Sequence, residues 1–272
     1  MHPRVPLSIF VAAVLLAAAW LDAAALARAV PILARHAPAA FVWTAPCAIA
    51  AWAIGGVSIS GAVAGALVGI LVLAGAGWPA WWLLGFTFLA TTISTRLGAS
   101  RKTAMGIAEP RRGRRDAGGI VANTAVAASA ALLIAADPGD AMPRVMFAAA
   151  LVTAGSDSVA SEIGKACGGA TRVIWTGRRV PPGTDGAISV AGTLAGALSA
   201  FALSAAAAAL TLIGARDVAI VAIASIAASL LEGAFAITLE RRGWLDNDGV
   251  NIAASALGAA LAALARARVP PG

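Results

Sequence analysis

The chain has 272 residues, of which 60% are hydrophobic and only 12% are charged. A soluble domain is about one quarter charged, and a chain with a mean hydropathy of +0.86 cannot hide its apolar surface in one water-soluble core. The composition therefore excludes an ordinary soluble enzyme and predicts an integral membrane protein.

The net charge is +7. In a soluble protein this would point to nucleic acid, but loops on the cytoplasmic side of membrane proteins carry an excess of Lys and Arg. We therefore expect no nucleic-acid partner. Cys47 and Cys167 have neither the spacing of a metal site nor that of a disulfide framework.

Apolar segments long enough to span or enter a bilayer follow one another along the chain. The first is interpreted as an uncleaved helix rather than a cleaved signal peptide, because its apolar run continues to Val30. The third is bordered by glycines, so a short or re-entrant helix is an alternative there. Trp78, Trp81 and Trp82 are interpreted as membrane anchors. The expected segments are 6–30, 39–55, 57–76, 79–95, 117–136, 142–156, 187–213, 217–239 and 249–267.

These segments predict an all-α fold: a polytopic transmembrane helical bundle with roughly seven to nine membrane helices, forming a single domain over 1–272. Polar segments interrupt the pattern at 96–116, 157–186 and 240–248. Two apolar segments separate each from the next, so all three emerge on the same side. Their Lys and Arg excess predicts that this side faces the cytoplasm of a multi-pass protein in the cell membrane.

The second polar segment begins with two carboxylates directly after an apolar helix. On a continuing helix, Asp157 and Ser161 share one face, while Glu162 diverges from Asp157. Ionisable groups at membrane depth are functional candidates. The alternative is an ordinary solvated helix end, with Asp157 as an N-cap.

The first polar segment contains a basic run, Arg111 to Arg115, broken only by Gly113. Arginines and a helix N-terminus suit phosphate. A topogenic cluster that binds acidic lipid headgroups is the alternative. The run leads into a helix that carries Asn123.

Further polar residues border the later helices. Pro and Gly residues over 176–186 predict a turn-rich loop that could place Thr184 over a phosphate, or a plain connector. Asn247 and Asn251 share one face of the last helix, which Asp246 is placed to cap. Glu232 lies in mid-helix, where a buried acid needs a partner or a role.

No Ser-His-Asp or Cys-His constellation is present, because His2 and His36 both lie away from the polar segments. Acids, asparagines and arginines on one face are instead suited to metal-assisted phosphoryl transfer. Asp246 and Asp248 with the two asparagines offer the oxygen ligands that Mg²⁺ prefers.

With these motifs in order along 50–265, the chain resembles the integral membrane family that contains the phytyl-phosphate kinases of plants and cyanobacteria and the animal transmembrane protein 19 (domain of unknown function 92). It is more distantly similar to dolichol kinases and phosphatidate cytidylyltransferases. The motifs that carry the resemblance are Thr95-Arg96, Lys102, Glu109, Gly113-Arg114-Arg115, Val121-Ala122-Asn123, Ser156 to Gly164, Val180 to Gly186 with Ser189, and Leu245 to Asp248 with Asn251.

The resemblance implies transfer of a phosphoryl group from a nucleoside triphosphate, CTP, to a prenyl monophosphate in the membrane, with Mg²⁺ as cofactor. It implies catalytic roles for Asp157, Glu162, Lys102, Arg114 and Arg115. Mg²⁺ would be held by Asp157, Glu162, Asp246 and Asp248, and the substrates by Asn123, Thr184, Asn247, Asn251, Glu109 and Glu232. The hypothesis requires Asp157 and Asp248 to lie on the same side of the bilayer.

The chain departs from the family's usual pattern at Arg96, Gly119 and Gly233. These departures leave the packing around the lipid pocket open. A prenol kinase, a lipid cytidylyltransferase, a lipid transporter or flippase, and a non-catalytic membrane protein remain alternatives. The sequence is also compatible with an oligomer.

Overall fold

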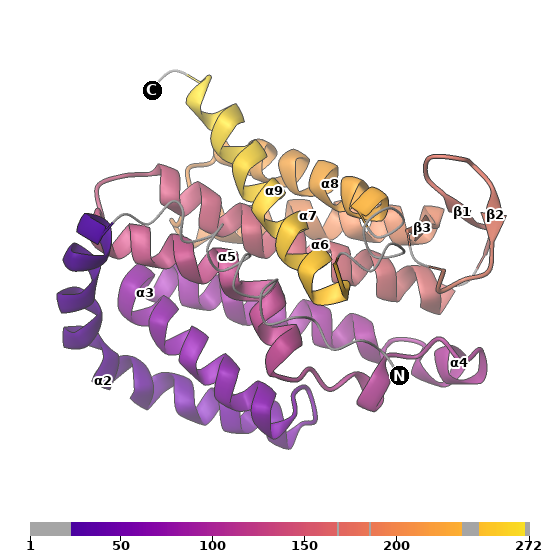
Figure 1. Ribbon diagram of the computed structural model, residues 1–272, viewed down its shortest axis with the longest axis horizontal. Helices are drawn as coiled ribbons and strands as arrows, with labels where there is room; N and C mark the ends of the chain where they lie inside the picture. Colours follow the sequence, from indigo (N-terminus) through magenta and orange to yellow (C-terminus); the bar gives the residue numbers. More distant parts are fainter. Residues whose placement is uncertain (1–22, 168, 185, 236–244, 270–272) are drawn as a thin grey trace.

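The computed structural model describes residues 23–167, 169–184, 186–235 and 245–269. Most of this part of the chain is helical (Figure 1). Residues 1–22, with most of the expected segment 6–30, lie outside it, as do Asp185 and 236–244. The helices are α2 Ala23–Ala53, α3 Ile59–Arg96, α4 Ala99–Ala104, α5 Ala117–Ala136, α6 Met142–Cys167, α7 Val190–Ala209, α8 Asp217–Phe235 and α9 Asn247–Ala267, with a 3₁₀ turn, η1, at Pro110–Gly113.

The long helix α3 contains two of the expected segments. Gly77 has a backbone φ of 78° and ψ of −173°. This conformation lies outside the helical region and is readily adopted by glycine, so the helix is interrupted there. The halves fold back on each other: a Cβ at Gly69 would lie 3.7 Å from Trp81 Nε1, and one at Gly56, just before α3, would lie 2.9 Å from the Phe88 ring. The expectation of separate helices over 57–76 and 79–95 is therefore realised as a hairpin.

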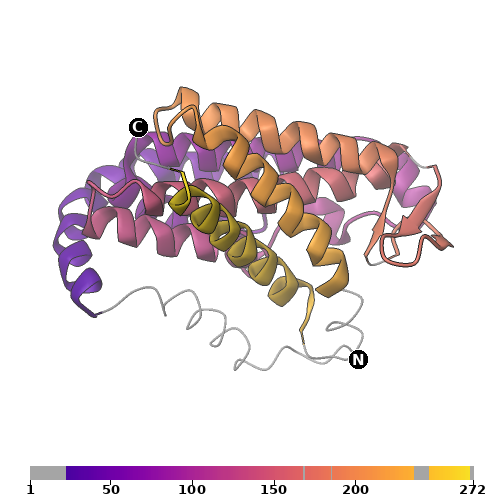
Figure 2. The same ribbon diagram turned by 90° about the horizontal axis from the view of Figure 1, so that it is seen from above.

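Helix α6 lies at the centre of the bundle and packs against α3, α5, α7, α8 and α9 (Figure 2). Its residues from Val145 to Val152 are almost completely buried. Several of them are alanines, which let the neighbouring backbones approach closely. The core of the protein is thus built around the helix that also carries the expected acids.

By length and composition, four of the described helices, α3, α5, α7 and α9, can cross a membrane. The membrane-helix fold is confirmed, and the helix count is somewhat lower than expected. Part of the difference comes from α3, whose 38 residues hold two of the expected segments. Another part comes from α6, where the polar residues after Ser156 continue the helix to Cys167.

The described parts of the three polar segments meet at one end of the bundle. Lys102 contacts Glu162, a Cβ at Gly118 would lie 2.8 Å from Asp248, and one at Gly183 would lie 2.8 Å from Ile107. A small antiparallel sheet of order β2-β1-β3 surrounds the expected turn-rich loop 176–186; β2 Arg179–Val180 lies within the loop, and β1 Thr171–Val173 and β3 Ala187–Ile188 flank it. Figure 1 shows this sheet and α4 at the same end.

The basic run is anchored at this end by its backbone. Ser58 N donates to Arg115 O at 2.9 Å, and Arg115 N donates to Gly56 O at 3.2 Å. Gly61 makes the close approach possible, because a Cβ there would lie 2.2 Å from Arg115 O. The arginines are therefore held against the start of α3 rather than on a free loop.

We predict that Gly61→Ala destabilises the protein by about 1–3 kcal/mol, because the added methyl group overlaps the Arg115 carbonyl. Thermal unfolding of the purified protein in detergent measures the effect. Gly65→Ala, one turn later in the same helix, is the matched control, because nothing lies within 4 Å of the added Cβ. Equal melting temperatures for the two variants would contradict the packing.

Candidate active site

Two cavities lie on either side of α6 at the polar end. The first, of about 550 Å³, we call the polar cavity. The second, of about 370 Å³, we call the apolar cavity. Because successive helix residues point about 100° apart, Asp157 lines the polar cavity while its neighbour Ser158 lines the apolar one.

The polar cavity brings together residues from several polar segments. Asp157 of α6 hydrogen-bonds the side chain of Glu232 of α8. Asn247 and Asn251 of α9 also line it. Asp157 therefore shares a cavity with the start of α9, on the same side of the bundle as Asp248. The other predicted residues in its wall are Glu109 and Thr184.

Glu162 lies between two lysines. Lys102 Nζ is 2.5 Å from its Oε2, and Lys165 Nζ is 3.3 Å from its Oε1. Lys165 Nζ also contacts Glu109 Oε1 at 2.7 Å. Burial raises the pKa of Glu109, but the charge and hydrogen bond of Lys165 outweigh it, so the pKa falls below its ordinary value. This chain of charges ties α4 and the loop before η1 to α6.

Lys102 is 1% exposed, and all the hydrogen bonds of its ammonium group are made within the protein. Its ammonium group donates to Thr95 O at 2.6 Å, Ser94 O at 3.4 Å and the Glu162 carboxylate. In this arrangement Lys102 fixes the fold around Glu162 and has no donor left for a phosphate. Both oxygens of Glu162 contact lysines, which compensate its buried charge.

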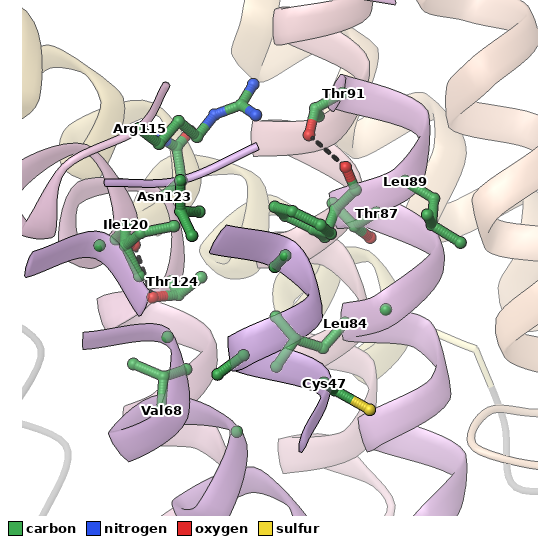
Figure 3. Close-up of a pocket in the computed structure, with 18 of the residues that line it drawn as sticks. Cys47, Val68, Leu84, Thr87, Leu89, Thr91, Arg115, Ile120, Asn123 and Thr124 are labelled. Carbon is green, nitrogen blue, oxygen red and sulfur yellow. Dashed lines mark hydrogen bonds between the residues drawn. The ribbon is translucent and has the colours of Figure 1, made fainter. Parts of the chain in front are cut away.

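The two arginines predicted to bind phosphate lie apart from the polar cavity. Arg114 is exposed, with its guanidinium next to Gly55. Arg115 and Asn123 line the apolar cavity (Figure 3). Burial lowers the pKa of Arg115, against the opposing charges of Glu109 and Glu162, and the group stays cationic because arginine is not deprotonated in proteins.

The remaining acids gather where α5 and α9 begin. Asp246 caps α9 by accepting from Gly249 N at 2.9 Å, and Asp116 caps α5 by accepting from Gly119 N at 3.1 Å. That backbone bond and the Arg111 side chain hold the pKa of Asp116 below its ordinary value. Asp248 borders Gly118 between them. Within the described ranges, no three His, Cys, Asp or Glu residues form a group that could hold a metal ion, so the four predicted metal ligands do not converge on one point.

Comparison with known proteins shows the family to which these two cavities belong. The family model of an integral membrane protein, DUF92, matches residues 41–259, which include both cavities. The chain belongs to the DUF92 family. The resemblance inferred from the motifs is thereby confirmed, over a range close to the expected 50–265.

Relatives of this DUF92 protein are found in distant organisms. It is 35% identical over 216 residues to the chloroplast protein VTE6 of Arabidopsis thaliana, covering 77% of this chain and 65% of VTE6. It is 36% identical over 199 residues to an uncharacterised membrane protein of Synechocystis, covering 72% of this chain and 77% of that protein. A membrane protein of Methanocaldococcus jannaschii is 29% identical over 210 residues, or 75% and 83% of the two chains. No solved structure matches.

Sequence reasoning missed Lys165. It lines the polar cavity and pairs with both Glu109 and Glu162. The i,i+3 spacing from Glu162 on one helix was the available signal. Hydroxyl groups of Ser161, Ser189 and Thr193 also border the cavity.

The polar cavity of this DUF92 protein fits a magnesium ion that arrives with a nucleotide. Mg²⁺ is usually held by one or two carboxylates together with substrate phosphates, not by an all-protein cage. Asp157 and Glu232 provide two facing carboxyl groups, with the amides of Asn247 and Asn251 in the same wall. We therefore predict that Asp157 and Glu232 would hold such an ion, and the roles of Glu162, Asp246 and Asp248 as ligands stay predictions.

We expect Lys102→Met to destabilise the fold by about 3–5 kcal/mol, because it leaves the Glu162 charge buried without its closest partner. Urea or thermal unfolding in detergent would show this. Arg101→Met, at the exposed preceding position, should change stability by no more than about 0.5 kcal/mol. The double variant Lys102→Met with Glu162→Leu should recover part of the loss, and a Lys102→Met protein as stable as the parent would refute the buried pair.

Proposed function

We propose that this protein is a CTP-dependent, Mg²⁺-dependent prenyl-phosphate kinase that converts phytyl or geranylgeranyl phosphate to the diphosphate. The proposal is carried by one observation: a polar cavity and an apolar cavity flank neighbouring residues, Asp157 and Ser158, of the same helix. A water-soluble nucleotide and a lipid phosphate need two such environments side by side. Membership in the family that contains the phytyl-phosphate kinases supports the reaction class.

The reaction forms one bond and breaks one. An oxygen of the acceptor phosphate attacks the γ-phosphorus of the nucleotide, and the bond from that phosphorus to the β–γ bridging oxygen breaks. The electron pair leaves with the nucleoside diphosphate. Because the second pKa of a phosphate monoester is about 6, the acceptor is largely a dianion at neutral pH and needs no general base.

The main barrier is repulsion between two polyanions, so the protein's task is to position them and to neutralise their charge. Mg²⁺, when bound, screens the nucleotide phosphates and orients the γ-phosphoryl group. Asp157 and Glu232 would hold that ion in the polar cavity. Lys165 offers a cation in the same wall, and Thr184, Asn247 and Asn251 offer hydrogen-bonding groups for phosphate oxygens. Arg115 approaches from the apolar side, within electrostatic range of Glu109.

The products separate this proposal from its rivals. With γ-labelled CTP and a prenyl monophosphate, we expect the label in a prenyl diphosphate, identified by mass spectrometry. A retained cytidine would indicate a cytidylyltransferase, and phosphorylation of the free alcohol would indicate a prenol kinase. Lipid flux in proteoliposomes without nucleotide consumption would indicate a transporter. Each of these outcomes would replace the proposed kinase.

Asp157→Asn should lower kcat by at least about 100-fold, because the amide keeps the shape but loses the charge that holds the metal. Initial rates at saturating CTP and acceptor measure the loss. Asp137→Asn is the matched control, since Asp137 is exposed in the α5–α6 connection and lines neither cavity. Full activity in Asp157→Asn would remove this carboxylate from the mechanism.

Removal of divalent cations by a chelator should abolish transfer, and Mg²⁺ should restore it. The apparent affinity for Mg²⁺ at fixed CTP should fall at least about tenfold in Glu232→Gln, because one of the two facing carboxylates is lost. An unchanged Mg²⁺ dependence in Glu232→Gln would place the metal elsewhere, for example beside Asp248.

A further inference from the structure

Most of the polar side chains that line the apolar cavity already donate hydrogen bonds within the protein. The hydroxyl groups of Thr87, Thr91 and Thr124 all donate to carbonyl oxygens of their own helices. The Asn123 amide donates to Gly119 O at 2.7 Å, and the Trp81 indole N–H donates to Thr44 Oγ1 at 3.1 Å. A ligand in this cavity finds methyl groups and rings, which suits a hydrocarbon chain and not a sugar or a base.

One polar group in the wall is left over. Arg115 Nη1 is buried with no hydrogen-bond partner among the described residues. A buried charged donor that makes no hydrogen bond destabilises the protein, because it has lost its contacts with water. Figure 3 shows Arg115 and Thr91 at one end of the cavity and Cys47 and Val68 at the other. The cavity thus combines an anion-seeking end with an apolar body.

The cavity is also reached from the membrane. Ile54, Phe86 and Leu89 line it and yet are 53%, 39% and 48% exposed on the surface. Large apolar side chains at an exposed rim face lipid in a membrane protein. An occupant can therefore enter sideways from the bilayer, without crossing the polar end.

Trp81 lines the cavity near Gly69 and Thr44, away from Arg115. A Cβ at Gly69 would lie 2.6 Å from Thr44 Cγ2 and 3.7 Å from the Trp81 indole nitrogen, so α2 and both halves of α3 meet there. Edge contacts with Trp78 and Trp82, at ring-centroid distances of 5.6 and 5.2 Å, hold the indole on both sides. From Thr91 to Trp81 the helix descends about 15 Å, at 1.5 Å per residue.

We propose that the apolar cavity holds the hydrocarbon chain of the lipid phosphate, with the phosphate at Arg115, and that Trp81 limits the chain length accepted. This inference rests on the proposed kinase function and adds the site and the specificity-determining residue for its acceptor. Gly85 lies four residues from Trp81 on the same half of α3, also in the cavity wall, and nothing lies within 4 Å of a Cβ added there. Space can therefore be added at Trp81 and removed at Gly85.

The test uses the full-length protein in detergent and prenyl monophosphates of increasing chain length. Trp81→Ala should raise the ratio of kcat/KM for long over short acceptors at least tenfold, because the indole that limits the chain length is removed. Gly85→Leu should lower the same ratio at least tenfold, because the new side chain fills the middle of the cavity. Trp43→Ala is the matched control: Trp43 is 58% exposed, lies outside the cavity wall, and contacts Trp78 of the same aromatic row.

Equilibrium binding of the same acceptors without nucleotide, measured by calorimetry, separates this inference from the kinase proposal. Opposite shifts in chain-length preference for binding, with no transfer in any protein, would keep the site and overturn the kinase. Transfer with unchanged chain-length preference in both variants would keep the kinase and overturn the site. Equal binding of a phosphatidic acid and a prenyl phosphate, insensitive to both substitutions, would show only ordinary membrane lipid in the cavity and would also overturn it. Should Trp81→Ala fail to fold, Gly85→Leu decides alone.

Discussion

A buried carboxylate between two lysines holds the functional end of this protein together. Glu162 is 3% exposed and accepts from Lys102 and Lys165, so its charge is compensated twice. Removing a carboxylate from water costs several kcal/mol, and only close partners with good geometry repay that cost. Because the partners come from α4 and α6, and Lys165 also holds Glu109, the pairing fixes the loop before η1 against the central helix. The position of the basic run then follows, since its backbone must pass between this loop and the start of α3.

Helix α6 separates the polar cavity from the apolar cavity. Along α6, the stretch from Val145 to Val152 is buried in the core of the bundle. The helical turns that follow have one face in the polar cavity and another in the apolar cavity. A lipid phosphate and a nucleotide have opposite demands, because one has an apolar tail that must stay in hydrocarbon and the other is a polyanion that must stay hydrated or paired. In the proposed kinase, a helix between two cavities would meet both demands and would let the phosphate ends approach at Asp157 and Ser158. The Gly77 hairpin serves this arrangement, since both halves of α3 line the apolar side.

Much of this could be inferred from the residues, and the limits have physical causes. The segment 117–136 was predicted with the bounds of α5, because the run is uniformly apolar and directly follows the charged residues that end at Asp116. The even number of apolar segments between the polar segments correctly predicted that the polar segments lie at one end. Pairings between segments were not readable, because Lys102 and Glu162 are 60 residues apart and either can equally suit a phosphate or an ion pair. The continuation of α6 past Ser156 was left open, because a solvated polar helix and a buried one have the same composition, and only packing against α7 and α8 decides between them.

Charge balance in the apolar cavity favours a phosphate over an alcohol as the acceptor. A prenol would place a neutral hydroxyl near Arg115 and leave the unpartnered guanidinium nitrogen without an anion. It would also require a base to remove a proton of high pKa, a role that would fall to a carboxylate of the polar cavity such as Asp157. A phosphate monoester supplies the missing anion and brings a nucleophile that is already ionised. The guanidinium nitrogen of Arg115 that has no hydrogen-bond partner among the described residues is therefore the group that would bind the acceptor's phosphate.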